Sequence, residues 1–213
     1  MNKFFRLACI GAIVMLTTVA CENVFTTSPY AGLRRDLNKM SLAQRQNFAR
    51  EALASGNIED AKSAFDALIE SADGSTDAEL NLLLVELGIQ ASGVPGIIPD
   101  LLALATSGDF SDEDALTGVL EGFLDQIDPY YALGAYEQLK QAKDNDGTVT
   151  EEQYLFVGVG LILGTVKNAE AESIDDLDPD DLDEIEGFLQ EAVDDLGTEN
   201  GILSSMLEYV NGL

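Results

Sequence analysis

Residues 41–72 read SLAQRQNFAREALASGNIEDAKSAFDALIESA and contain the signals of two helices joined by a tight turn. Ser41 is followed three residues later by Gln44, which is the spacing of a capping box, where each side chain satisfies a backbone N–H group at the start of a helix. Gly56 and Asn57 then interrupt the pattern, because glycine readily adopts the left-handed backbone that ends many helices. We therefore expect two helices, over 41–55 and 58–72.

The rest of the chain repeats this pattern of caps and hydrophobic spacing. No stretch alternates as a half-buried strand would, and the long apolar run 154–166 follows a second capping pattern at Thr150, which favours a buried helix. We expect an all-α fold of stacked antiparallel helical hairpins, either an α-solenoid or a compact bundle. The further helices expected run from Ser75 or Thr76 to Gly93, from Pro99 through Leu104 after a break at 93–96, from Ser111 to Ile127, from Asp128 to Lys143, from Glu151 to Lys167, from Asp178 to Leu196 and from Ile202 to Val210.

Two short matches indicate an internal repeat. The tetrapeptide Glu-Gly-Phe-Leu occurs at 121–124 and again at 186–189. The second match is a set of four residues, Ala61, Ala64, Phe65 and Leu68, which recurs 71 residues later as Ala132, Ala135, Tyr136 and Leu139. Repeated helical units bury their apolar faces by stacking, so both matches favour a series of hairpins.

The turn and second helix of 41–72 resemble a tetratricopeptide (TPR) repeat. In that family a glycine opens the turn, a small alanine lets the paired helices approach, and an aromatic residue fills the gap to the next unit. The resemblance implies a TPR-like helical-hairpin domain and, because TPR arrays are generally protein-interaction scaffolds, a scaffold function. The residues that carry it are Gly56, Ile58, Ala61, Phe65 and Leu68.

The resemblance covers one repeat, with a degenerate echo around residues 118–142. The first helix has Ala49 and Ala52 where the family usually has Gly and Tyr, and the chain contains no Trp. The family's period of about 34 residues is also not kept along the chain. These departures leave the architecture TPR-like without defining a particular family.

The first twenty-one residues have the order of a secretory signal. Lys3 and Arg6 precede an apolar run over 7–20, which is too short to span a bilayer and leads into Cys21. A cysteine at the cleavage point resembles the signal of a bacterial lipoprotein, in which that cysteine becomes the lipidated first residue, although Thr18 stands where such signals usually have Leu. The resemblance implies a signal peptide at 1–20, a lipid on Cys21, a polar tether over 21–40 and a helical domain over 41–213.

The residues around the expected cleavage point also bear on location and redox state. Glu22 is not the Asp often associated with inner-membrane retention in enteric bacteria, so we expect the periplasmic face of the outer membrane. Cys9 would leave with the signal and Cys21 would carry lipid. The mature chain is then expected to form no internal disulfide and to depend on packing alone.

Charge is distributed unevenly along the chain. The formal net charge is −28, yet residues 22–62 hold six bases and five acids, whereas the chain after Lys62 holds three bases and 34 acids. Such a body repels nucleic acid and anionic lipid headgroups, so we expect neither as a partner. Solubility or a saline habitat is the alternative reason for the acidity, because net charge concerns solubility and association rather than fold.

Residues 144–149 resemble the middle of a calcium-binding EF-hand loop. Such a loop places oxygen ligands at alternating positions, glycine sixth and a bidentate Glu twelfth. With Gly147 sixth, Asp144 and Asp146 occupy ligand positions, but Ala142 and Gln153 stand at the two ends where ligands are required. A turn that precedes the next helix is the competing interpretation, and no metal site is assigned beyond these two weak candidates.

The densest acidic run has seven carboxylates within residues 175–184. It could collect divalent cations or dock a basic partner, or its acids could simply favour the positive N-terminal end of the next helix. Three glycines at 158, 160 and 164 do not match a dinucleotide fingerprint and fall within an expected helix. We expect them to let helices cross closely.

Enzyme chemistry is poorly supported by the composition. The chain has no histidine, so it lacks an imidazole base and a histidine metal ligand. The carboxylate pair Asp125 and Asp128 is more simply a solvated helix end, and Cys21 would be acylated. We expect neither an enzyme nor a cofactor.

The leading functional hypothesis is a lipid-anchored periplasmic scaffold that binds another protein of the bacterial cell envelope. Its near-neutral end and its acidic body would offer contrasting docking surfaces, the former through Gln44, Arg45 and Arg50. The alternative is an accessory carrier of a small molecule or ion, associated with a transport system, whose apolar helices over 80–92 and 154–166 line a ligand cavity. A divalent-cation binder is a third hypothesis, and the sequence leaves the oligomeric state open.

Overall fold

A computed structural model describes residues 37–107, 122–171, 173–197 and 201–212. Its contacts divide the chain into one unit up to Lys39 and a second from Met40 to Leu213. In the first unit, the described residues form a 3-10 turn, η1, at Leu37–Lys39. The expected signal, Cys21 and most of the tether lie outside the described residues, as does most of the helix expected from Ser111.

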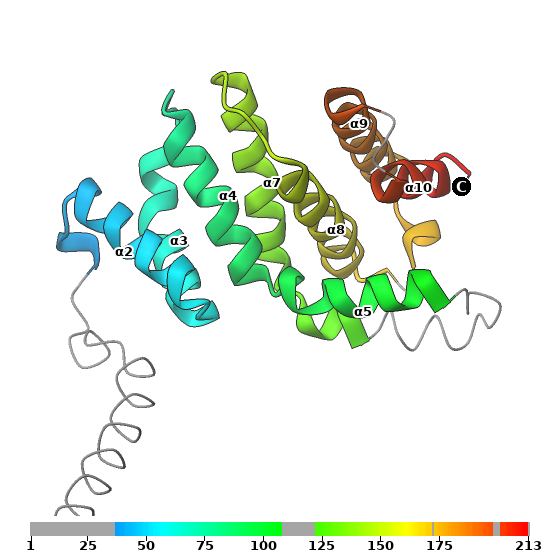
Figure 1. Cartoon of the computed structure of the whole chain (residues 1–213), viewed down its shortest axis with the longest axis horizontal. Helices are drawn as coiled ribbons and strands as arrows, with labels where there is room; N and C mark the ends of the chain where they lie inside the picture. The colour runs from blue at the N-terminus through cyan, green and yellow to red at the C-terminus, as the bar shows by residue number, and fades with distance from the viewer. Residues whose placement is uncertain (1–36, 108–121, 172, 198–200, 213) are drawn as a thin grey trace, which may run out of the picture. The chain divides into compact units, whose positions relative to one another are not determined.

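The described part of the second unit is all-α, as the sequence predicts, and it contains no strand. Its helices pack against their neighbours along the chain, as in a helical bundle or solenoid (Figure 1). Residues 122–126 are also helical. The elements are α2 (Leu42–Ser55), α3 (Ile58–Ala72), α4 (Ala78–Ser92), α5 (Val94–Ser107), α7 (Pro129–Asp144), α8 (Glu151–Asn168), η2 (Ile174–Asp176), α9 (Pro179–Leu196) and α10 (Gly201–Val210).

Local capping signals account for most helix boundaries. The predicted capping boxes are confirmed at Ser41 before α2 and at Thr150 before α8. Gly56 ends α2 with φ +66°, a left-handed conformation that glycine adopts without steric cost. The predicted cap of α4 is wrong: α4 begins at Ala78, so Asp77 is its N-cap and accepts from two backbone N–H groups, while the Ser75 hydroxyl accepts the Asp77 N–H.

Helix α5 begins earlier than the sequence predicts. We expected a break at 93–96 and a start at Pro99, but Gly93 alone makes the turn, with φ +88°, and α5 starts at Val94. The Ser92 hydroxyl accepts the Val94 N–H at 3.2 Å and so caps the new helix. Pro99 lies inside α5, where its ring removes one hydrogen bond that this short helix tolerates.

The helices stack as three antiparallel hairpins, α2 with α3, α4 with α7, and α8 with α9 (Figure 1). The first helices of the hairpins also touch in succession, α2 with α4 and α4 with α8, and α10 packs on α9 and α8. The middle hairpin is discontinuous in sequence, because residues 94–127 leave α4 and return before α7 begins. Hence the N-caps Ser41 and Asp77 are 36 residues apart, whereas Asp77 and Thr150 are 73 apart.

The described ends of the inserted segment 94–127 share a small buried cluster with α7 and α8. Val94 and Ile97 pack with Phe123 and Ile127 against α7 and α8. Its return is fixed at the base, where the Asp128 N–H donates to the Ser92 carbonyl at 2.9 Å. The described ends of the segment therefore pack against the hairpin that it interrupts, and α7 pairs with α4.

The seam between α4 and α7 is very close at its centre. A Cβ atom placed on Gly88 would lie 2.8 Å from the Ala135 Cβ and 2.9 Å from the Tyr131 carbonyl oxygen. At the far end of the seam, the Asn145 side chain donates to the Ser75 carbonyl at 3.2 Å. These contacts fix both the antiparallel direction and the register of the two helices.

Close packing at Gly88 predicts a large effect of one methyl group. We expect Gly88→Ala to lower the free energy of unfolding by about 1–3 kcal/mol, because backbone of α7 stands where the new methyl must go. Gly187→Ala is the matched control, since nothing lies within 4 Å of that position on α9, and it should stabilise by up to about 1 kcal/mol. Urea denaturation measures both, and a Gly88→Ala chain as stable as the unaltered one would contradict the seam.

Candidate functional site

The residues of the TPR-like motif lie in and around the first hairpin. Ala61, Phe65 and Leu68 are buried, whereas Ile58 is 43% exposed at the start of α3. The Phe65 ring packs edge-on against Tyr131 of α7, with ring centres 5.4 Å apart. The motif thus fills the space between the first hairpin and the second.

The loop with the two weak metal candidates is a helix C-terminus in this structure. The Gly147 N–H donates to the Ala142 carbonyl at 2.8 Å, and Asp146 takes a left-handed backbone with φ +61°. Asp144 and Asp146 are exposed. Within the residues that the structure describes, no three acidic, histidine or cysteine side chains converge as metal ligands would.

The carboxylates of the acidic run over 175–184 lie in different environments. Asp180 and Asp181 lie in the first turn of α9, where the helix dipole favours negative charge. Asp183 lines a surface pocket, and Glu184 accepts a hydrogen bond from α7. The run is therefore divided between a helix start, a pocket and an interhelix contact.

A lysine, a tyrosine and carboxylates recur together at three interhelix contacts, which we call lysine clasps. In the first, Lys62 of α3 pairs with Asp128 at 2.9 Å and lies 5.3 Å from the centre of the Tyr131 ring. The Tyr131 hydroxyl in turn donates to Asp66 of α3 at 3.2 Å. This clasp joins α3 to the start of α7, and Asp128 belongs to it rather than to a solvated pair with Asp125.

The other two clasps join α7 and α8 to α9. Lys140 lies 4.7 Å from the centre of the Tyr136 ring, and both side chains contact Glu184, the tyrosine hydroxyl at 3.0 Å. In the third clasp, Lys143 pairs with two acids one turn apart on α9 and lies over the Tyr154 ring, whose hydroxyl donates to one of them. Those acids are Glu191 and Asp195.

The third clasp shifts the pKa values of Tyr154, Lys143 and Asp195. Burial and the hydrogen bond to Asp195 raise the pKa of Tyr154 to about 12. Burial lowers the pKa of Lys143, but its hydrogen bonds to Asp195, Glu191 and Tyr154 outweigh this effect and raise it. The same bonds from Lys143 and Tyr154 lower the pKa of Asp195 below its ordinary 3.8. The clasp thus stabilises the charged lysine and the charged aspartate together.

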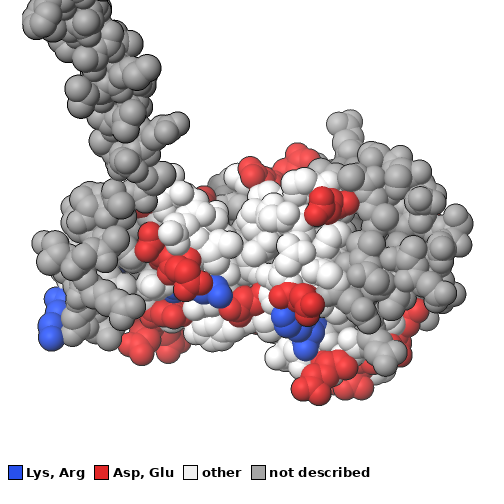
Figure 2. Space-filling view, turned by 90° about the horizontal axis from the view of Figure 1, so that it is seen from below, with Lys and Arg blue, Asp and Glu red and all other residues white. Residues whose placement is uncertain are grey.

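Every base that follows Lys62 in the sequence contacts a carboxylate or a backbone carbonyl of this same chain. Lys140 and Lys143 belong to clasps, and Lys167 donates to the carbonyls of Leu124 and Ile127 at 2.6 and 2.8 Å, which holds the inserted segment. Figure 2 shows one face of the molecule, where blue cationic atoms near the middle lie against red acidic atoms. The many acids beyond Lys62 therefore have few internal counter-charges left.

The exposed side chains Glu86 of α4 and Glu152 of α8 interact through their charges, and we call Glu86, Glu152 and Gln153 the acidic seam. Burial, and then the neighbouring charge of Glu152, raise the pKa of Glu86. The Gln153 amide approaches the Glu86 carboxylate at 3.5 Å. One turn along α4, Gln90 donates to the Gly56 carbonyl at 3.0 Å. The seam therefore continues toward the turn of the first hairpin and offers a place for positive charge.

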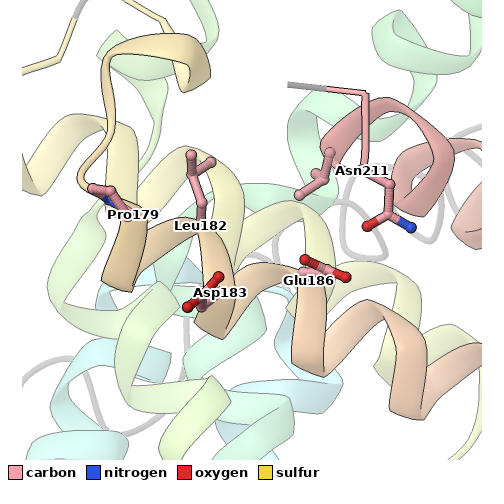
Figure 3. Close-up of a pocket in the computed structure, with 6 residues that line it drawn as sticks. Pro179, Leu182, Asp183, Glu186 and Asn211 are labelled. Carbon is pink, nitrogen blue, oxygen red and sulfur yellow. The ribbon is translucent and has the colours of Figure 1, made fainter.

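A surface pocket of about 420 Å³ lies between the first half of α9 and the end of α10. In Figure 3, Pro179, Leu182, Asp183 and Glu186 follow one another along α9, and Asn211 lies beyond the end of α10. Val210 completes the lining and is buried. The pocket combines apolar surface with two exposed carboxylates and one carboxamide.

The structure also places the residues expected to form the near-neutral docking surface. Gln44 is engaged in the capping box of α2, and Arg45 donates to the Ala67 carbonyl of α3. Arg50 is exposed, with a contact to Asn47 on its own helix at 3.5 Å. Two of the three side chains thus serve the first hairpin itself.

Glycines in α8 do permit close helix crossings, as predicted. A Cβ on Gly164 would lie 3.3 Å from the Ala132 Cβ of α7, and one on Gly158 would lie 3.4 Å from the Phe188 ring of α9. The sequence did not reveal the lysine clasps, the acidic seam or the pocket. The one available signal was Lys140, which follows Tyr136 by four residues in one expected helix of a chain with very few bases.

Comparison with protein-family models, curated proteins and solved structures finds no match for this chain. Among the described helices, none by itself combines the length and apolar character of a membrane span. Helix α4 and the part of α5 up to Leu101 are together long and apolar enough for a membrane span, but the chain bends by 67° between them, at Gly93.

The third clasp predicts a pH-dependent contribution to stability. We expect Lys143→Met, which keeps the apolar stem, to lower the free energy of unfolding at pH 7 by about 1–2 kcal/mol, because two acids of α9 lose their cation. The pKa of Asp195 is lowered by folding, so this contribution is present above its ordinary value of 3.8 and is lost as pH falls through the lowered value.

Urea denaturation at several pH values measures this effect. The difference between Lys143→Met and the unaltered chain should shrink below about pH 4. Arg50→Met is the control and should change stability by less than about 0.5 kcal/mol, since its contact is exposed and within one helix. A Lys143→Met effect that is the same at pH 7 and pH 3 would contradict the clasp.

Proposed function

We propose that the protein is a lipid-anchored helical scaffold that binds another protein of the bacterial envelope, on the periplasmic face of the outer membrane. The signal-like order of residues 1–21 supports the anchor at Cys21. The TPR-like pattern over 41–72 and the stack of hairpins support a role in protein binding, because stacked hairpins present extended surfaces. The proposal assigns the chain neither a catalytic step nor a cofactor.

One observation carries the proposal: all three lysines of the chain after Lys62 bind groups of the protein itself. Lys140 and Lys143 hold α9, and Lys167 holds the inserted segment. The surplus of carboxylates thus favours a partner with a basic surface and speeds its encounter at low ionic strength. The acidic seam is the expected docking area, because a cation placed there would relieve the repulsion between Glu86 and Glu152.

Packing supports a scaffold over the carrier alternative. The carrier requires the apolar helices over 80–92 and 154–166 to line a cavity. Instead, Val85 and Ile89 of α4 share one buried cluster with Tyr154, Val157 and Leu161 of α8. Their apolar sides are filled by protein, so a ligand would have to displace well-packed side chains.

A pull-down from the native envelope after crosslinking tests the proposal. We expect the lipidated chain to recover a protein with a basic segment, and Glu86→Lys with Glu152→Lys to reduce its recovery at least tenfold through charge repulsion. The control is Glu70→Lys with Asp73→Lys, an equal charge change at exposed sites of α3 and its C-cap, which should retain most of the partner.

The anchor is tested in the same experiment by Cys21→Ser. This chain should incorporate no labelled palmitate and should leave the membrane fraction. The proposal fails if nothing specific is recovered with the lipidated chain, or if both charge-reversal pairs reduce recovery equally. It also fails if Cys21→Ser remains lipidated.

A further inference from the structure

Helix α9 presents carboxylates on two of its sides. Toward α7, Glu184, Glu191 and Asp195 hold Lys140 and Lys143. Toward the end of α10, Asp183 and Glu186 border the pocket of about 420 Å³. The same helix therefore holds Lys140 and Lys143 on one side. On the other side, two of its acids border the pocket (Figure 3).

The pocket has an apolar floor and a polar rim. Leu182 is half-buried and Val210 is buried, and Pro179 extends the floor toward the start of α9. Asp183 and Glu186 lie three residues apart, on one face of the helix. Asn211 adds a carboxamide, whose oxygen can accept a further hydrogen bond. The lining suits a ligand with a short apolar stem and a cationic, donor-rich end.

We propose that this pocket binds a lysine side chain of the partner protein. The methylene stem lies along Leu182 and Val210, and the ammonium group donates to the carboxylates of Asp183 and Glu186. Lysine suits this site because its ammonium has three donors and its stem prefers apolar surface. The inference rests on the proposed function, since it names a chemical feature of the same partner.

Charge complementarity favours a cationic occupant, and the three lysines of the acidic body do not supply it. The three bases after Lys62 are engaged elsewhere: Lys140 and Lys143 contact the opposite side of α9, and Lys167 contacts the inserted segment. The third clasp shows that two acids about one turn apart on α9 can bind a lysine, because Glu191 and Asp195 bind Lys143. Asp183 and Glu186 also lie about one turn apart on α9, beside the apolar surface of Leu182 and Val210.

A peptide titration tests the inference on the full lipidated chain in neutral detergent at physiological ionic strength. The probe is the capped tripeptide acetyl-Gly-Lys-Gly-amide, observed through backbone amide shifts. We expect saturable shifts at Gly187 and Gly212, which neighbour Glu186 and Asn211, and negligible shifts at the distant Gly74 and Gly96. The same tripeptide with norleucine keeps the stem without the ammonium and should not shift them.

Two charge-matched variants locate the binding. Asp183→Asn with Glu186→Gln should weaken binding of the lysine peptide at least fivefold, whereas Glu70→Gln with Asp73→Asn should change it by less than twofold. The inference is overturned if norleucine binds as well as lysine, if the two variants weaken binding equally, or if the shifts spread evenly over the acidic surface.

The pull-down separates this inference from the proposed function. We expect Asp183→Asn with Glu186→Gln to reduce recovery of the partner at least fivefold. Undiminished recovery would overturn the lysine pocket and leave the scaffold proposal in place. Conversely, failure of the unaltered chain to recover any partner, with peptide binding intact, would remove the scaffold proposal and the partner assignment, while the pocket's selectivity for lysine would remain.

Discussion

The close approach of α4 and α7 at Gly88 is the constraint on which the rest of the fold depends. These helices are separated in the chain by the whole segment 94–127, yet the backbone of α7 lies where a side chain on Gly88 would be. With α7 held against α4, Phe65 of the first hairpin packs edge-on against Tyr131 of α7, and Tyr136 of α7 donates to Glu184 of α9 in the third hairpin. The seam therefore joins the two ends of the stack.

The same arrangement determines how charge is used. A chain with few bases keeps Lys62, Lys140 and Lys143 at the joints between hairpins, where tyrosine rings and carboxylates surround them. Lys62 and Lys143 are partly buried at these joints, where charge is screened less than on an open surface, whereas Lys140 is more exposed. Because these lysines are used in contacts between helices, the surface keeps little positive charge. A basic partner would meet this acidic surface.

Local signals in the sequence were enough for most of the helices, because caps such as Ser41 and Thr150 act through neighbouring residues. The start of α5 was misjudged, since Ser92 and Gly93 begin a new helix at once where the Gly-Val-Pro-Gly sequence suggests a longer break. The pairing of α4 with α7, the clasps and the pocket join residues far apart in sequence. Periodicity does not determine such contacts, which depend on which faces finally meet.

The most direct test of this account is the pairing of α4 with α7. In a chain whose Cys9 and Cys21 are replaced by serine, Ser75→Cys with Asn145→Cys places two thiols where the Asn145 side chain now reaches the Ser75 backbone, at 3.2 Å. Mild oxidation should join them rapidly within one molecule. Ser75→Cys with Gln126→Cys should not react, because residue 126 lies beside Gly93 at the other end of α4, a helix of about 22 Å. Equal reactivity of the two pairs, or none in the first, would contradict the stacked-hairpin account.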